Sequence, residues 1–438
     1  MGADPCSSPA AADGPPGTPA PVAGRPPRLW TTAFARVWAG SALSSVSSRT
    51  LSVAYPLLAL AVDGSPVGAG WVSFALTLPV LLFYIPAGVL ADRVDPRSLM
   101  LFTEAARGLS VVSVLLALAL GRLSLPHMLA AAFLEGTLWV LYTLAETALL
   151  PSLVPEGQIG AAMARSETSS HAAVLAGRPL GGLLFGLAPA VPFAVNTALF
   201  LGSTLCLLGR TGKARPYGGR RVLRELSGRS LVSETFDGVR ELSKHGFLSR
   251  ATIMTTVTNL MVNALIMIFL TSSAGLSPLE VGLVLAAGGV GGVLGSTLLS
   301  STEPRNAILF TQMWIWVLAL ALPALNAHPV LFGLATLITG YTGARNNVAV
   351  RTYEIHKVDR SKLGRVASVQ RLAVYGAVCL AAPFGGFLVA AFGVHNAAVS
   401  LFGVMLAVAV AVTIARFLGW VPRFGGGDQA PPASRPAS

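Results

Sequence analysis

Long apolar stretches recur along almost the whole chain and are separated by polar connections. A helix that spans a membrane needs about 20 mostly apolar residues, and twelve stretches meet this requirement. Their approximate ranges are 34–60, 68–91, 98–121, 126–150, 160–188, 191–209, 249–272, 279–301, 306–325, 329–352, 363–390 and 395–419. Because most connections are only a few residues long, neighbouring spans should be antiparallel. The pattern predicts an all-α membrane protein with twelve transmembrane helices.

One connection, residues 210–248, is much longer than the others and contains nine lysines and arginines. It divides the chain into an N-terminal half at 34–209 and a C-terminal half at 249–419, each with six predicted helices. The ends of the chain, residues 1–33 and 420–438, are rich in proline, alanine and glycine, which predicts disordered tails.

The long connection contains a short apolar pattern of its own. Phe236, Val239, Leu242 and Phe247 recur near helical spacing. Such a stripe predicts an amphipathic helix on the membrane surface. A solvated linker helix would give the same pattern, so both interpretations stay open.

The two predicted halves resemble each other in sequence. Residues 154–187 align with residues 358–391 at a constant offset of 204 positions, and eight positions are identical. Both segments contain the pattern P-x-G-G, which begins at Pro179 in the first and at Pro383 in the second. Parallel copies of a six-helix unit are a transporter architecture. The repeat therefore predicts two pseudo-symmetric halves.

Composition and charge agree with a membrane location. Charged residues make up 11% of the chain, whereas soluble domains contain about 25%. If the N-terminus is inside, the inner loops hold fifteen lysines and arginines and the outer loops hold only Arg122. The positive-inside rule then places both termini in the cytoplasm. The net charge of +12 reflects this topology and attraction to anionic lipids, so we do not expect a nucleic-acid partner.

Enzyme motifs do not accompany the apolar spans. The sequence lacks H-E-x-x-H, G-x-S-x-G and Walker A patterns. The glycine-rich run "GGVGGVLG" at 288–295 lies inside an apolar span, where it predicts close helix packing. Cys6, Cys206 and Cys379 are far apart and lack metal-ligand spacing. We therefore expect no catalysis, no metal and no cofactor.

Four charged residues interrupt the apolar pattern in "AGVLADRVDPRSLM", residues 87–100, between the second and third spans. This stretch resembles the loop signature G-x-L-[AD]-D-[RK]-x-G-[RK]-[RK] of the major facilitator superfamily, with Gly88, Asp92 and Arg93 at matching positions. Asp95 stands where glycine is usual. The segments "LVPEGQIGAAMA" and "LGRVAS" further resemble the drug-exporter branch, which includes macrolide-efflux proteins and siderophore exporters.

This resemblance implies a major facilitator fold with a gate at its inner side. Gly88 would let two helices approach closely, and Asp92 would complement a nearby helix N-terminus. Arg93 and Arg97 would pair with acids of the other half and hold the inner side closed. The alternative is a turn whose charges only set the topology.

Two positions depart from the drug-exporter pattern. In "GRPLGG", Arg178 precedes Pro179, and the proline is shifted relative to the usual motif. The first span contains Arg49 and several serines, where that branch often has an acid. A proton site therefore cannot be carried over to the first span.

Charged residues inside the spans need a partner or a function, because each costs about 2.5–3.5 kcal/mol on insertion scales. Glu104 and Arg107 are one turn apart and are predicted to form a local structural pair. Glu135 is the main candidate for proton coupling, and Glu146 is a further candidate.

Glu135 and Arg178 lie at similar predicted depths on consecutive spans. Opposite charges in that position should pair, since each would otherwise be buried alone. We predict an ion pair between them that loosens when Glu135 is protonated, with Arg49 as the rival partner. A permanent ion pair without a coupling role is the alternative.

Polar residues on other spans suggest a substrate pocket. Asn259 and Asn263 are four residues apart and share one helix face. Arg345 and Asn346 interrupt the tenth span, and Trp139 is one turn from Glu135. In the major facilitator fold, the first, fourth, seventh and tenth helices line the cavity. Helix–helix hydrogen bonding would explain the same residues without a substrate.

The sequence thus predicts a proton-coupled efflux transporter of drug-like or secondary-metabolite molecules. We expect a monomer in the cytoplasmic membrane of a bacterium, with a small-molecule substrate, protons and anionic membrane lipids as its partners. Two alternatives stay open: uptake of a small nutrient by the same fold, and a membrane scaffold or sensor without transport.

Overall fold

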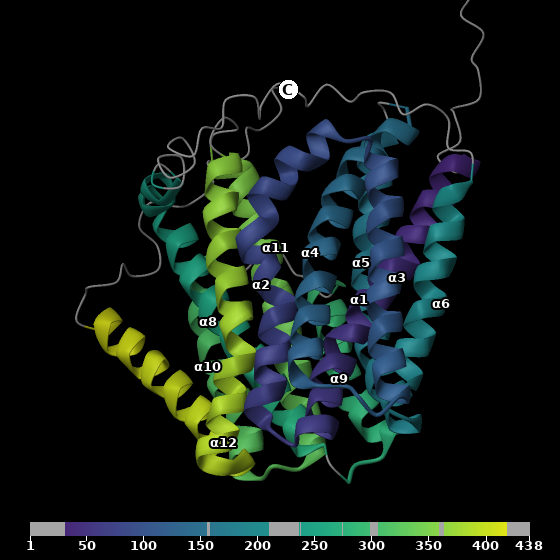
Figure 1. The fold of residues 1–438 in the computed structure, drawn as a ribbon. Coiled ribbons are helices and arrows are strands. Elements are labelled where there is room, and N and C mark those ends of the chain that lie inside the picture. Colours follow the sequence, from purple (N-terminus) through teal and green to yellow (C-terminus); the bar gives the residue numbers. More distant parts are fainter. Residues whose placement is uncertain are drawn as a thin grey trace, which may run out of the picture.

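The structure of the chain, a computed structural model, describes residues 31–155, 158–209, 236, 238–273, 275–297, 305–358 and 363–417. Nearly all of these residues are helical (Figure 1). The predicted tails lie almost entirely outside the described residues.

The helices fall into two groups along the chain. The first group contains α1 (Thr32–Asp63), α2 (Pro66–Arg93), α3 (Pro96–Ala119), α4 (Leu125–Leu149), the short 3-10 helix η1 (Leu150–Leu153), α5 (Ile159–Leu187) and α6 (Val191–Leu208). The second group contains α8 (Gly246–Ser272), α9 (Pro278–Thr297), α10 (Arg305–Leu325), α11 (Pro329–Lys357) and α12 (Leu363–Phe417). We call the end of the bundle where α1 begins the near end, and the end where α1 stops the far end.

The last helix, α12, is two helices joined at Gly393, whose φ of 77° and ψ of 167° are not helical. The arm after Gly393 is tilted away from the axis that the other helices follow (yellow in Figure 1). Only glycine adopts this backbone conformation easily. With α12 counted as two arms, each of the twelve predicted spans overlaps one helix or arm.

Hydropathy agrees with a membrane location for much of this bundle. Seven of the described helices are long and apolar enough to cross a membrane, and shorter apolar helices lie at Glu280–Gly295 and Leu309–Leu325. The prediction of an all-α membrane protein is therefore confirmed.

The pairs of packed helices are repeated in the two groups. In the first group α2 packs on α4, α1 on α5, and α3 on α6. The corresponding pairs in the second group are α9 with α11, α8 with α12, and α10 with α12. Contacts between the groups are made mainly by α2 with α12 and by α5 with α9. This repeated packing agrees with pseudo-symmetric halves, while the half boundaries at 209 and 249 stay predictions.

Residues 238–244, in the long connection, are helical. Leu242 and Phe247 are buried and pack with Tyr353 of α11. Phe236 and Val239, which the sequence pattern places on the same face, are exposed. The C-terminal part of this apolar stripe therefore packs on the second group, whereas its N-terminal part is exposed. Whether that surface meets a membrane stays a prediction.

Glycines bring the helices of the second group into backbone contact. A Cβ built on Gly291 of α9 would overlap the carbonyl of Leu337 on α11, and one on Gly295 would overlap the carbonyl of Tyr341. Gly340 of α11 meets Gly288 in the same way. The prediction that "GGVGGVLG" mediates close helix packing is therefore confirmed.

This packing predicts a site-specific effect of a single methyl group. Gly291→Ala should destabilise the protein by about 1–3 kcal/mol, because the backbones must separate to admit the Cβ. Gly292→Ala is the matched control, since its Cβ would lie 4.0 Å from the nearest atom, Gly340 O. Thermal melting of the two purified variants in detergent tests this, and equal melting temperatures would contradict it.

Candidate functional site

A buried arginine, Arg107, lies in the middle of the first group of helices. Its side chain is fully buried, and it forms five hydrogen bonds. Nε and Nη2 donate to Glu135 Oε1 at 3.0 and 2.6 Å. Nη1 donates to Glu104 Oε1 at 2.9 Å and to Ser44 Oγ at 2.7 Å, and Nη2 also donates to Ser48 Oγ. A guanidinium has five N–H groups, so Arg107 has none left for another acceptor.

The two carboxylates around Arg107 are not satisfied in the same way. Glu104 is fully buried and Glu135 is 1% exposed. Glu104 Oε1 accepts a further hydrogen bond from Ser44 Oγ at 2.7 Å. Glu104 Oε2 and Glu135 Oε2, however, accept no hydrogen bond from any of the described residues. One cation therefore serves two buried acids, and each acid keeps one oxygen that could bind a proton.

This ion cluster, formed by Glu104, Arg107 and Glu135, is far from both ends of the bundle. Arg107 is eleven residues from the start of α3, or about 16 Å at 1.5 Å per residue. The guanidinium carbon lies 4.4 Å from the centroid of the Phe200 ring on α6. An aromatic face stabilises a cation in a poorly solvated place. The cluster thus joins α1, α3, α4 and α6.

The predicted ion pair between Glu135 and Arg178 is wrong, because Glu135 binds Arg107 instead. The reason is the neighbouring helix. The main packing partners of α4 are α2 and α3, whereas α5 packs on α1 and α9. The rival partner, Arg49, does not bind Glu135 either. The predicted local pair of Glu104 and Arg107 is confirmed, with 2.9 Å between Oε1 and Nη1.

Arg49 and Arg178 lie together where α1 and α5 cross. A Cβ built on Gly177 would be 2.6 Å from Arg49 Cβ, and Thr50 Oγ1 donates to Gly177 O at 3.2 Å. Arg178 directly follows Gly177, so both arginines lie at this crossing. This close crossing of α1 and α5 was not predicted from the sequence, although the glycine before Arg178 was a signal for it.

Glu146, the further coupling candidate, is separate from the ion cluster. It is partly buried near the near end of α4, and Ser166 Oγ on α5 donates to its Oε1 at 3.1 Å. One hydroxyl replaces only part of the hydration of a carboxylate, so Glu146 stays a candidate with a weaker structural basis.

The asparagines of α8 use their amide nitrogens within their own helix. Asn259 Nδ2 donates to Thr255 O at 2.8 Å and Asn263 Nδ2 donates to Asn259 O at 2.9 Å. Both side chains are partly buried. Their role in substrate binding stays a prediction.

On α11, Asn346 is 2% exposed and its Nδ2 donates to Thr255 Oγ1 of α8 at 2.7 Å. This contact is the helix–helix hydrogen bond that was left open as an alternative. The guanidinium carbon of Arg345 lies 5.8 Å from the centroid of the Tyr341 ring on the same helix. Trp139 of α4 is partly buried against a cluster that contains Val80, a different cluster from the one around the asparagines.

The predicted inner gate is described only in part. Gly88, Asp92 and Arg93 lie in the last turns of α2, but their side chains are outside the described part of the structure. Arg97 donates to three carbonyls at the end of α6, those of Leu207, Leu208 and Gly209, at 2.8–3.1 Å. Cations favour helix C-termini, so Arg97 caps α6 in its own half. The expectation that it pairs with an acid of the other half is wrong.

The residue that departs from the loop signature, Asp95, also has a local role. It is the N-cap of α3, and its Oδ2 accepts hydrogen bonds from the backbone N and Oγ of Ser98, both at 2.8 Å. Asp95 thus caps α3, while the capping role expected for Asp92 lies outside the described side chains.

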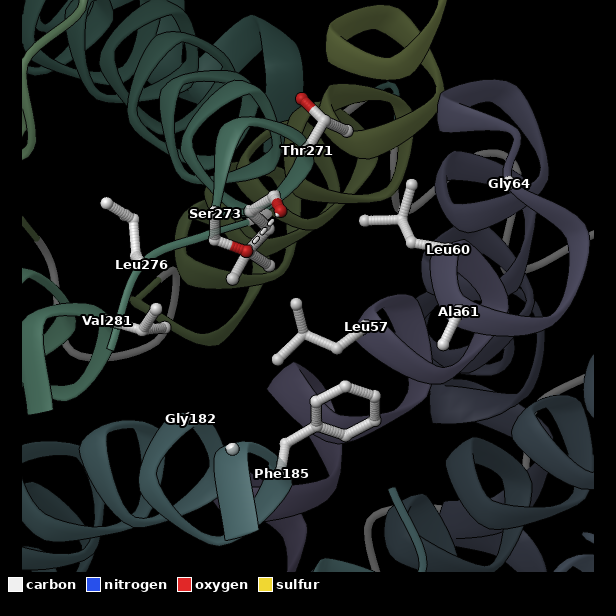
Figure 2. Close-up of a pocket in the computed structure, with 12 residues that line it drawn as sticks. Leu57, Leu60, Ala61, Gly64, Gly182, Phe185, Thr271, Ser273, Leu276 and Val281 are labelled. Carbon is white, nitrogen blue, oxygen red and sulfur yellow. Dashed lines mark hydrogen bonds between the residues drawn. The ribbon is translucent and has the colours of Figure 1, made fainter. Parts of the chain in front are cut away.

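A cavity of about 360 Å³ lies at the far end, on the seam between the two groups. Its lining is mostly apolar and comes from α1, α5, α8, α9 and the turn after α8 (Figure 2). Figure 2 shows Leu57, Phe185 and Val281 around the opening. None of the predicted substrate residues lines this cavity.

The repeated packing of the two groups of helices is similar to the internal repeats of membrane transporters. The sequence model of the Major Facilitator Superfamily matches residues 37–382. The chain therefore belongs to this superfamily and is a transporter, not an enzyme.

Relatives agree with this assignment at low identity. The uncharacterized MFS-type transporter y4rN of Sinorhizobium fredii is 26% identical over 344 residues, which cover 75% of this chain and 81% of that protein. The multidrug efflux pump Tap of Mycolicibacterium fortuitum is 26% identical over 358 residues, which cover 78% and 86%.

Solved structures show the same fold. The nucleoside transporter NupG has a TM-score of 0.67 at 12% identity and covers 88% of this chain and 99% of its own. A bacterial homologue of the human lysosomal transporter Spinster, inward-facing and occupied, has a TM-score of 0.66 at 16% identity and covers 91% and 98%. Identities this low support the fold alone.

The ion cluster predicts that removing Arg107 lowers stability strongly and that neutralising its two acid partners restores much of the loss. Arg107→Leu should destabilise the protein by about 3–5 kcal/mol, because two buried carboxylates lose their cation. Adding Glu104→Gln and Glu135→Gln to this variant should recover much of the loss. Arg122→Leu, at an exposed turn, is the control. Thermal melting in detergent measures all three, and an unchanged melting temperature for Arg107→Leu would contradict the cluster's role.

Proposed function

We propose that this protein exports drug-like or secondary-metabolite molecules in exchange for protons, by alternating access. The superfamily supports transport of a small molecule, and the similarity to the pump Tap supports efflux. The choice of protons as the coupling ion is carried by one observation, the sharing of Arg107 by two buried carboxylates.

Charge counting explains why this cluster suits proton transfer. With both carboxylates ionised, the cluster has a net charge of −1 in a region where an unbalanced charge is costly. With one proton bound it is neutral. Arg107 cannot give up its own proton, so only the acids can change state. Binding of one proton thus switches the cluster between two charge states.

The cluster is connected to the surface between the two groups of helices. Arg107 holds Ser44 and Ser48 of α1. In turn, α1 packs on α5, and α5 packs on α9 of the second group. A proton on Glu135 would weaken its attraction to Arg107 and release part of the restraint on α1. A shift of α1 would pass to the α5–α9 contact, where alternating access requires movement.

We further propose that the near end faces the cytoplasm of a bacterium and that the protein works as a monomer. The excess of lysines and arginines in the near-end loops supports this orientation. The α2–α3 turn would then belong to the inner gate. Anionic lipids would contact the same basic side.

Proteoliposomes with an imposed pH gradient test the coupling. Wild-type protein should move a fluorescent dye in the direction opposite to the protons, with ethidium and carboxyfluorescein as a cationic and an anionic probe. Glu135→Gln and Glu104→Gln should each reduce gradient-driven flux at least tenfold, because each leaves a neutral cluster that cannot lose a proton. Asp63→Asn changes an exposed acid and should have no effect.

The same assay separates the alternatives. Normal gradient-driven flux in both glutamine variants would contradict proton coupling through the cluster. Dye accumulation in the direction of the protons would indicate uptake. If the dye moves no faster in proteoliposomes than in empty liposomes, with or without the gradient, the scaffold or sensor interpretation would be favoured.

The gate interpretation makes a separate prediction. Asp92→Asn should abolish most transport while the amount of protein in the membrane stays normal, because the inner side could not be held closed. Arg97→Gln should have a smaller effect, since Arg97 caps α6. Flux normalised to membrane protein measures both variants, and normal flux in Asp92→Asn would exclude a gate role for this residue.

A further inference from the structure

Arg49 and Arg178 are two cations whose charge is not balanced by any described residue. The acids of the neighbouring membrane helices are engaged elsewhere: Glu104 and Glu135 bind Arg107, and Glu146 binds Ser166. Among the described residues, neither arginine forms a salt bridge or a side-chain hydrogen bond. An arginine in a membrane span without a partner is costly and marks a functional site.

The two arginines are held together by the backbone. Because Gly177 has no side chain, Arg49 lies directly against α5, next to Arg178. The hydrogen bond from Thr50 Oγ1 to Gly177 O fixes this crossing. Like charges that lie near each other repel, and an anion between them would relieve this repulsion.

The pair lies next to aromatic side chains from both groups of helices. Tyr375 of α12 lies near Arg49. The ring of Tyr375 is 6.4 Å from that of Tyr84 on α2, centroid to centroid. Trp139 of α4 packs on the same small cluster. Arg371 Nη1, on α12, donates to Tyr84 Oη at 3.1 Å. The arginines thus adjoin an aromatic surface on the seam where the two groups meet.

We propose that Arg49 and Arg178 bind the anionic group of the transported molecule, a carboxylate or phosphate on an aromatic body that contacts Tyr84, Trp139 and Tyr375. This inference rests on the proposed transport function and narrows its substrate class. Guanidinium groups match planar and tetrahedral oxyanions with pairs of N–H donors. Two of them side by side favour an anion over a neutral or cationic molecule. The rings supply a flat apolar surface for the rest of the ligand.

Binding to the purified full-length protein in detergent tests the site without transport. Phenyl phosphate and benzoate should bind saturably in calorimetry, whereas benzyl alcohol should not. Arg49→Gln and Arg178→Gln should each weaken phenyl phosphate binding about tenfold or more, because charge-assisted hydrogen bonds are lost. Arg122→Gln, at an exposed turn, should bind normally. Unchanged affinity in both arginine variants would overturn the proposal.

Stability without ligand gives an independent result. If the arginines exist to bind an anion, Arg178→Gln should melt at a higher temperature than wild type, since one buried repulsion disappears. Arg178→Glu should melt higher still, because the introduced carboxylate could pair with Arg49, and this variant should not bind phenyl phosphate. A purely structural role predicts lower melting temperatures for these variants, and that outcome with normal anion binding would overturn the proposal.

One further measurement distinguishes a lipid headgroup from a soluble anion, and another distinguishes failure of the anion site from failure of the proposed exchange. In nanodiscs of phosphatidylcholine alone, phenyl phosphate should bind; binding of only phosphatidylglycerol would assign the site to a lipid headgroup and overturn the substrate assignment. Glu135→Gln should still bind phenyl phosphate while losing gradient-driven flux. Conversely, normal proton-driven efflux of ethidium with no anion binding would overturn the anion site and leave the proposed exchange intact.

Discussion

The structure of the first group depends on how one guanidinium is satisfied. Arg107 uses all five N–H groups, on α1, α3 and α4, and its face lies on a ring of α6. Since the group stays charged at any physiological pH, these helices must supply acceptors wherever they move. Only the number of protons on Glu104 and Glu135 can vary. In the proposed mechanism, this permanent cation, which joins four helices to two acids, would couple the binding of a proton to helix position.

Close backbone approach determines where side-chain chemistry can occur. On α9 and α11, glycines such as Gly291 and Gly340 bring the backbones so close that no side chain fits between them. On α1 and α5, Gly177 produces the same contact, but Arg49 lies opposite it and Arg178 follows it in the chain. The contact that gives rigidity in one group therefore presses two cations together in the other. The positions of the glycines thus determine which side chains lie beside a close helix contact.

Much of the fold was predictable because the membrane restricts the possible structures. Each apolar stretch of the sequence overlaps a helix or an arm of α12, and the glycine-rich sequence correctly indicated helix packing at 288–295. Partner choice was less predictable. Arg107 and Arg178 both match Glu135 in depth, and depth does not say which helix lies beside α4. The correct partner could, however, be found by counting residues on either side of the turn between α3 and α4. Arg107 is twelve residues before the end of α3, and Glu135 is ten residues after the start of α4, so the α3–α4 turn places them opposite each other.

Adjacent positions of α1 connect the two unusual charge arrangements. Ser48 binds Arg107 in the acid-rich cluster, and Arg49, the next residue, belongs to the proposed anion site. An anion on Arg49 and Arg178 would remove a positive field that favours ionised carboxylates nearby. Direct electrostatics alone would therefore make the anion and the proton bind together, and linkage makes this effect reciprocal. Exchange needs the opposite, with each ligand bound in a different state. Exchange at these sites therefore requires two positions of α1, one that presents the arginines and one that admits the proton, with an energy difference large enough to outweigh the direct field.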